Sequence, residues 1–97
     1  VADVRNSPAL KVLALLRDHG IEVAYHDPWV PALGPEDGGL RSTPLTADAL
    51  GAVDCVIVHT DHSAFDYDRI VAESRLVFDL RNATRSVRAG RERVVRL

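Results

Sequence analysis

Two short runs of consecutive apolar residues, 55–58 and 76–78, place the tightest limit on how this chain can fold. Each run shows the pattern typical of a strand buried on both faces of a parallel sheet. A segment with helical character precedes each of them, at 45–51 and at 65–74. Helix and strand in alternation predict an α/β layered domain with a mostly parallel sheet.

The first part of the chain begins the same alternation. A capping hydroxyl at Ser7 and a proline at Pro8 form a good helix start, and residues 10–16 supply a broad apolar face. Gly20 is the residue type at which a helix usually ends in a left-handed turn. The alternating, β-rich segment 21–25 then predicts a strand.

The segment from Asp27 to Thr46 interrupts the alternation. Its prolines and glycines forbid regular structure over most of its length. Loops this long are usually functional or disordered. We expect a mobile middle of variable length, with the Asp27-Pro28 end held by the strand before it.

Capping residues mark the two helices of the second half. Thr46 is the expected cap of the helix 45–51, and either Ser63 or Asp66 is the expected cap of the helix 65–74.

Composition narrows the class of protein. The 97 residues predict one domain, 1–97, with 46% apolar residues and no run long enough to span a membrane. A single cysteine, Cys55, excludes an internal disulfide and indicates a reducing compartment, so a cytoplasmic location is expected. The net charge of −2 gives no general reason to bind nucleic acid or an anionic membrane.

Three segments follow predicted strands: 25–28, 59–62 and 79–82. Because ligands bind beyond the carboxyl ends of the strands in open parallel sheets, these segments are expected to line one edge. The 59–62 segment, His-Thr-Asp-His, contains metal-ligand types, but its spacing does not match the common motifs and no second cluster completes a site. No metal site is therefore predicted, and a structural role is favoured.

Nucleophilic catalysis is not favoured either. No G-x-S-x-G elbow is present, and Ser63 follows His62 directly, where their side chains would not meet as in a catalytic triad. Cys55 falls within an apolar run, which predicts an inert core residue.

Glycine-rich phosphate loops are missing from the sequence, so arginines or helix N-termini would have to hold any phosphate. Arg81, after a strand, and Arg5, before a helix, are the best placed, although a surface ion pair is an equal alternative for each. The tail from Arg81 to Arg96 holds six arginines and one acid, Glu92. It predicts a solvated surface or a phosphate contact, and residues 94–97 predict a final strand.

Four ordered segments resemble those of one protein family. Residues 3–10, 26–31, 60–67 and 78–82 are similar to the D-x-R-x-S-P-A-L, Y-D-P-Y-V-P, T-D-H-x-x-F-D and D-x-R-N elements of the UDP-glucose/GDP-mannose dehydrogenase family's C-terminal UDP-binding domain. The resemblance implies a Rossmann-like three-layer domain. It also implies an NAD-dependent, two-step oxidation of a UDP-sugar 6-hydroxyl to a uronic acid.

Residue roles follow from the same resemblance. Arg81 matches the arginine that contacts the UDP-sugar, and Arg5 matches one on the NAD side of the cleft. An arginine fork can hold a pyrophosphate in a bidentate manner. The family's catalytic groups, its reactive cysteine included, belong to upstream parts, and Cys55 does not match that cysteine. We expect this fragment alone to be inactive, with NAD bound mainly by the N-terminal domain.

One departure concerns the start of the domain. The family domain normally begins with a strand and a G-x-A-[FY]-K segment, whereas here Val1 stands two residues before the D-x-R element. The sheet is therefore expected to lack its first strand, and the exposed edges predict either self-association as a homo-oligomer or a partner chain that fills the gap.

The sequence leaves alternatives for the sugar that is oxidised and for the class of protein. The T-D-H-x-x-F-D form resembles dehydrogenases of UDP-N-acetylhexosamines more than those of UDP-glucose. A non-catalytic, flavodoxin-like interaction module is the alternative function. Nucleic-acid binding through the arginine-rich tail is disfavoured, because the tail has no aromatic residue for bases to stack on.

Overall fold

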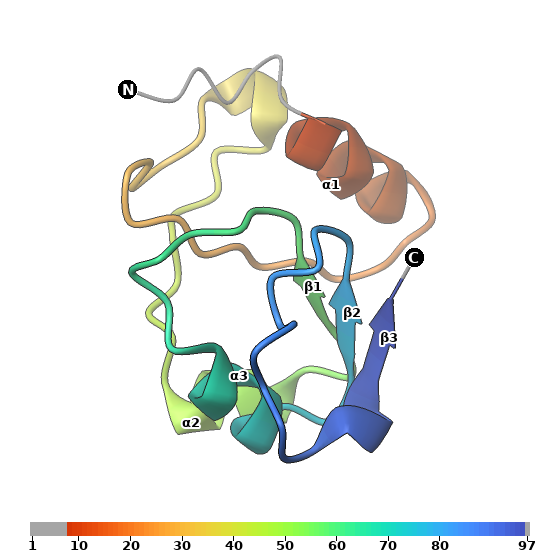
Figure 1. Cartoon of the computed structure of the whole chain (residues 1–97). Helices are drawn as coiled ribbons and strands as arrows, with labels where there is room; N and C mark the ends of the chain where they lie inside the picture. Colours follow the sequence, from red (N-terminus) through yellow and green to blue (C-terminus); the bar gives the residue numbers. More distant parts are fainter. Residues whose placement is uncertain (1–7, 97) are drawn as a thin grey trace. The chain divides into compact units, whose positions relative to one another are not determined.

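The structure is a computed structural model that describes residues 8–96. Its elements in chain order are α1 (Pro8–Asp18), α2 (Ala47–Ala52), β1 (Val56–Val58), α3 (Tyr67–Glu73), β2 (Val77–Asp79) and β3 (Val94–Arg96), with short 3-10 helices at Pro35–Asp37 and Arg91–Arg93. The chain divides between Pro44 and Leu45 into two compact units, and each is described by itself. Figure 1 labels the helices and strands. Among the described residues, no helix has the length and apolar character needed to cross a membrane.

The first unit is built on α1. Buried Leu10 and Leu13 of this helix form a small core with Leu33 of the following loop. The helix ends where predicted, because Gly20 takes a left-handed conformation, with φ of 75°, and its amide bonds to Arg17. A β-branched or bulky residue at this position would be strained.

The predicted strand at 21–25 is wrong. Tyr25 forms only an isolated bridge with Ser42, and no strand of the sheet includes this segment. The Tyr25 carbonyl accepts instead from the Thr43 amide at 2.7 Å. The Tyr25 carbonyl, which the alternating pattern predicted to pair in a sheet, is therefore satisfied by the proline-rich loop.

That loop is internally hydrogen-bonded. The Leu33 amide donates to Leu40 at 2.8 Å, and the Ser42 amide donates to Pro31 at 2.8 Å. Its start is held by the loop itself and not, as expected, by a preceding strand, since the Asp27 amide donates to the Ser42 hydroxyl at 3.0 Å.

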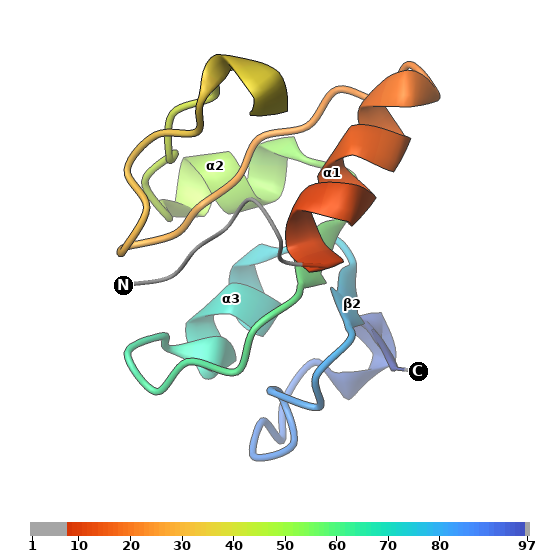
Figure 2. The same cartoon turned by 90° about the horizontal axis from the view of Figure 1, so that it is seen from above.

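The second unit contains the sheet. Its strands lie in the order β1-β2-β3, and both neighbouring pairs are parallel, as the apolar runs predict. The helices confirm their predicted caps, because the side chain of Thr46 accepts from Ala49 and that of Asp66, rather than Ser63, accepts from Arg69. Figures 1 and 2 both place α2 and α3 on one side of this sheet, and the two helices contact each other.

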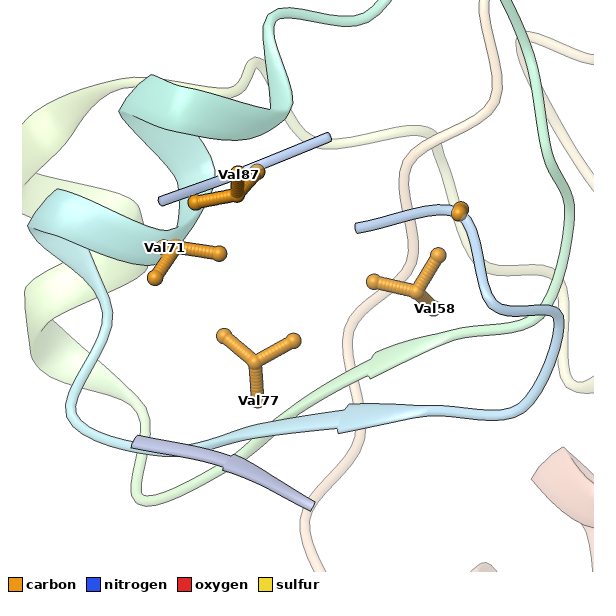
Figure 3. Close-up of a cluster of buried hydrophobic side chains, with 5 residues drawn as sticks. Val58, Val71, Val77 and Val87 are labelled. Carbon is orange, nitrogen blue, oxygen red and sulfur yellow. The ribbon is translucent and has the colours of Figure 1, made fainter. Parts of the chain in front are cut away.

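The core of this unit lies between α3 and the sheet. Val71 from α3 and Val77 from β2 are fully buried and pack with Val58 and Val87, as Figure 3 shows. The unit described here thus has a helix layer and a sheet layer. The third layer, and the lack of a first strand, stay predictions.

The sheet is not buried on both faces, as was expected: the face opposite the helices is partly exposed. Strand register aligns Ile57, Phe78 and Val95 in one row across the three strands. Ile57 is 38% exposed and Val95 is 48% exposed. Successive residues of a strand point alternately to the two faces of the sheet. A continuous apolar run therefore places apolar side chains on both faces, but it does not show that both faces are buried.

Candidate functional site

Asp79, the last residue of β2, shapes the turn that follows the strand. Its Oδ1 accepts hydrogen bonds from the backbone amides of Arg81 and Ala83, each at 3.0 Å. Its Oδ2 accepts from the amide of Thr84 at 2.8 Å and from the Thr84 hydroxyl at 2.6 Å. Burial alone would raise the pKa of Asp79, but the hydrogen bonds from Thr84, Ala83 and Arg81 outweigh it and lower the pKa below its ordinary value. The buried carboxylate therefore stays charged and organises the loop.

Asn82 lies at the tip of this loop in a left-handed conformation, with φ of 56°. Asparagine tolerates this region better than most residues. Its side-chain oxygen accepts a hydrogen bond from Nη1 of Arg96, the last residue of β3. Its backbone carbonyl accepts from Nη1 of Arg85 at 3.0 Å, and the same nitrogen lies 2.7 Å from Asp61 Oδ2. The loops after β1 and β2 are thus tied together through Arg85.

A pocket of about 520 Å³ opens at this edge of the sheet and is lined by Asp79, Leu80, Arg81, Asn82 and Arg96. Two of these residues carry positive charge. Asp79 is the one acidic lining residue, and its oxygens are already occupied by donors of its own loop. The electrostatics of the pocket therefore favour an anion.

Arg81 is available for such a ligand. In the part of the chain that the structure describes, its guanidinium takes part in no ion pair, so the alternative of a surface ion pair finds no partner there. A guanidinium presents five N–H donors in a planar fork that matches phosphate oxygens.

The loop after β1 uses its polar groups internally. The Tyr67 hydroxyl accepts from the His62 amide at 2.8 Å and donates to the Thr60 carbonyl at 3.2 Å, and burial raises the pKa of this hydroxyl. His62 Nδ1 accepts from the Ala64 amide at 3.1 Å. Within residues 8–96, no group of three or more potential ligands is arranged to hold a metal ion. The structural role favoured for the His-Thr-Asp-His segment fits these bonds.

Two further arginines of the tail stabilise the backbone. Arg91 Nη1 donates to the carbonyl of buried Thr84 at 2.6 Å. Arg93 Nη1 donates to the carbonyls of Val71 at 3.3 Å and Ala72 at 2.8 Å, at the end of α3. Three of the six arginines in the tail, Arg85, Arg91 and Arg93, therefore have structural bonds.

Cys55 is not the core residue that its apolar neighbours predicted. It precedes β1, which begins at Val56, and it is exposed. Partial burial of the sulfur raises the pKa of the thiol, with a weaker opposing effect from the backbone of Phe78. A raised pKa disfavours the thiolate that nucleophilic catalysis needs.

The structure brings together two of the three predicted strand-end segments. Residues 59–62 follow β1 and residues 79–82 follow β2, and the parallel pairing places both at one edge. Residues 25–28 follow no strand and belong to the other unit. Arg5 lies outside the described residues.

Arg96 is the pocket residue that sequence reasoning missed. The sequence predicted a final strand at 94–97, and the strand is found at Val94–Arg96. Arg96 could have been found from the sequence, because ligands bind beyond the carboxyl ends of parallel strands and Arg96 ends β3 as Asp79 ends β2.

Open α/β domains bind their ligands beyond the carboxyl ends of the strands, and the two arginines of this pocket suit an anionic ligand. Residues 1–86 match the model of the UDP-glucose/GDP-mannose dehydrogenase family, UDP binding domain. The chain belongs to this family, which confirms the resemblance seen in its sequence motifs. Members of the family are NAD-dependent UDP-sugar dehydrogenases.

Two relatives come from Methanococcus maripaludis, and both are UDP-N-acetyl-D-mannosamine dehydrogenases. The protein of strain C7 is 30% identical over 92 residues, which cover 84% of this chain and 20% of the relative. The protein of strain S2 is 29% identical over 92 residues, with the same shares covered. The chain thus spans 20% of the length of these relatives. No solved structure gives a significant match.

Proposed function

We propose that this chain is the UDP-sugar-binding domain of an NAD-dependent nucleotide-sugar 6-dehydrogenase, with Arg81 as a ligand of the UDP-sugar. One observation carries the proposal: Arg81 lines a pocket at the carboxyl end of β2 and has no ion-pair partner among residues 8–96. The backbone at Arg81 is fixed by the Asp79 loop, because the Arg81 amide donates to Asp79. A fixed backbone lowers the freedom that is lost when the ligand binds.

The proposed substrate is a UDP-N-acetylhexosamine, with UDP-glucose as the alternative sugar. The proposed reaction is oxidation of the C6 hydroxyl to a uronate. Two observations support the N-acetylated sugar: the T-D-H-x-x-F-D form of residues 60–66, and the UDP-N-acetyl-D-mannosamine dehydrogenase activity by which both Methanococcus maripaludis relatives are named.

In the proposed enzyme, this chain binds the UDP-sugar and does not supply the catalytic groups. The catalytic groups and most of the NAD contacts would belong to other parts of a longer protein, so the isolated chain is predicted to be inactive. Arg5 is proposed to reach the NAD side of the cleft. The single domain at 1–97, a cytoplasmic location and a homo-oligomeric enzyme stay predictions.

The test is NADH formation by the full-length protein that contains this sequence. UDP-N-acetylglucosamine, UDP-N-acetylmannosamine and UDP-glucose are assayed with the wild type, Arg81→Ala and Arg88→Ala. Arg88 is a matched control, because it is an exposed arginine of the same tail that does not line the pocket. We expect activity on one sugar, a loss on the order of 10- to 100-fold in kcat/KM for Arg81→Ala, and little change for Arg88→Ala.

Other outcomes separate the parts of the proposal. Turnover that survives Arg81→Ala would remove Arg81 from the binding site and leave the dehydrogenase function standing. No NADH with any UDP-sugar would overturn the enzymatic function and favour the non-catalytic interaction module.

A further inference from the structure

We propose that Arg96 is a second anion ligand of the pocket and binds the diphosphate of the nucleotide together with Arg81. This inference rests on the proposed function and adds a binding residue to it. Arg96 lies beyond residue 86, where the match to the family ends. Its role is therefore argued from the structure alone.

The first step is the register of the sheet. Asp79 of β2 pairs with Arg96 of β3, so the two strands end side by side at the same edge. Arg81 follows Asp79 by two residues and lines the same pocket as Arg96. Neighbouring strands are separated by about 4.8 Å, a spacing at which two guanidinium groups can reach the two phosphoryl groups of one diphosphate.

The second step is charge. Arg81 and Arg96 are the cations of the pocket lining, and Asp79 is its only acid. Four donors on Arg81, Ala83 and Thr84 already occupy the Asp79 carboxylate, which is 1% exposed. Two positive charges that face an open pocket match the charge of a nucleotide diphosphate diester, which carries one negative charge on each phosphoryl group.

The third step is how Arg96 is held. Arg85, Arg91 and Arg93 donate to carboxylate or backbone oxygens that shape the fold. Arg96 donates to a neutral side-chain amide, the Oδ1 of Asn82, through Nη1. This bond uses one donor nitrogen and leaves the rest of the guanidinium fork for a ligand.

Asn82 therefore acts as a positioning residue for Arg96. Its left-handed backbone turns the loop so that the amide oxygen meets β3. A guanidinium anchored in this way is ordered before the ligand arrives, which lowers the entropic cost of binding. Charge-assisted hydrogen bonds to phosphate are about twice as strong as those between neutral groups, so a phosphate would add to this arrangement.

The experiment measures KM for the UDP-sugar and for NAD separately, because both contain a diphosphate. The full-length protein is compared as wild type, Arg96→Ala, Arg96→Lys and the control Arg88→Ala. For Arg96→Ala we expect KM for the UDP-sugar to rise on the order of 10-fold or more, with KM for NAD unchanged. Arg96→Lys keeps the charge but loses the fork, and an intermediate KM is expected.

A direct binding measurement separates phosphate contact from folding. Titration calorimetry with UDP and with uridine is performed on wild type and Arg96→Ala, and thermal melting reports on the fold. We expect the affinity for UDP to fall and that for uridine to stay the same. Asn82→Gly, which tolerates the left-handed backbone but lacks the amide oxygen, should weaken UDP binding by less than Arg96→Ala does.

The results distinguish this inference from the function on which it rests. If NADH forms, Arg81→Ala impairs it and Arg96→Ala behaves like Arg88→Ala, the role of Arg96 is wrong and the dehydrogenase function stands. A rise of KM for NAD alone would assign Arg96 to the cofactor and would also overturn the inference. Absence of NADH from wild type with every sugar would instead be a failure of the proposed function.

Discussion

The carboxylate of Asp79 accepts both the backbone amide and the hydroxyl of Thr84, at 2.8 and 2.6 Å. Both residues are almost fully buried, with 1% and 0% of their surface exposed. The Thr84 carbonyl accepts in turn from Arg91 at 2.6 Å. One buried negative charge thus holds the turn from which Arg81 extends into the pocket.

Asp79→Asn is expected to destabilise the chain by about 2–3 kcal/mol, because an amide nitrogen would face backbone donors and leave them unsatisfied. The measurement is the free energy of unfolding in urea. Asp54→Asn is the matched control, since the Asp54 side chain is fully exposed and its contact with Arg75 is 3.6 Å long. Equal losses in the two variants would contradict the structural role of Asp79.

The same carboxylate predicts a dependence of stability on pH. Hydrogen bonds lower the pKa of Asp79 in the folded state against the opposing effect of burial. Its contribution is therefore present above the unfolded pKa of about 4 and is lost as the pH falls through the lower folded pKa. We expect the stability difference between wild type and Asp79→Asn to shrink between about pH 5 and about pH 2. A difference that stays constant over this range would show that the charge is not what stabilises the loop.

Gly90→Ala is expected to cost more than Gly20→Ala. The two glycines have nearly the same left-handed backbone, with φ of 79° and 75°. A Cβ at Gly90 would lie 3.0 Å from Cγ1 of buried Val71, whereas a Cβ at Gly20 would meet nothing within 4 Å. Backbone strain should cost about 1–2 kcal/mol at each site, and the contact with Val71 should add about 1 kcal/mol at Gly90. Thermal unfolding of both variants tests this. Equal shifts of the melting temperature would show that Val71 moves aside without destabilising the core.

Ser74→Ala is expected to stabilise the chain by about 1 kcal/mol. Ser74 is 3% exposed, and its hydroxyl has no hydrogen-bond partner among residues 8–96. Removing a buried hydroxyl that makes no bond removes its desolvation penalty. The exposed Ser86→Ala is the control and should change the unfolding free energy by less than about 0.5 kcal/mol. A destabilised Ser74→Ala would mean that the hydroxyl has a partner in solution.

Local patterns in the sequence were sufficient for most of the second unit. Thr46 and Asp66 cap their helices with bonds to residues three positions along the chain, so nearby sequence specifies them. The parallel sheet follows from apolar runs that alternate with helices. Arg81 could be predicted because the end of a strand is readable from the run that precedes it.

Other features depended on contacts between distant segments. Alternation at 21–25 predicted a strand, but the backbone there pairs with the loop at Ser42 and Thr43. Cys55 was placed in the core by its apolar neighbours, yet the strand begins one residue later and leaves it exposed.

The amino-acid sequence was sufficient to predict the family, the order of helices and strands in the second unit, and Arg81 as a candidate ligand. These depend on motifs, caps and periodicity, which act over a few neighbouring residues. The folded arrangement was needed to find that Arg96 shares a pocket with Arg81 and that Asn82 anchors Arg96. Parallel pairing of β2 with β3 brings these residues together, and such pairing is set by packing between segments that are remote in the chain.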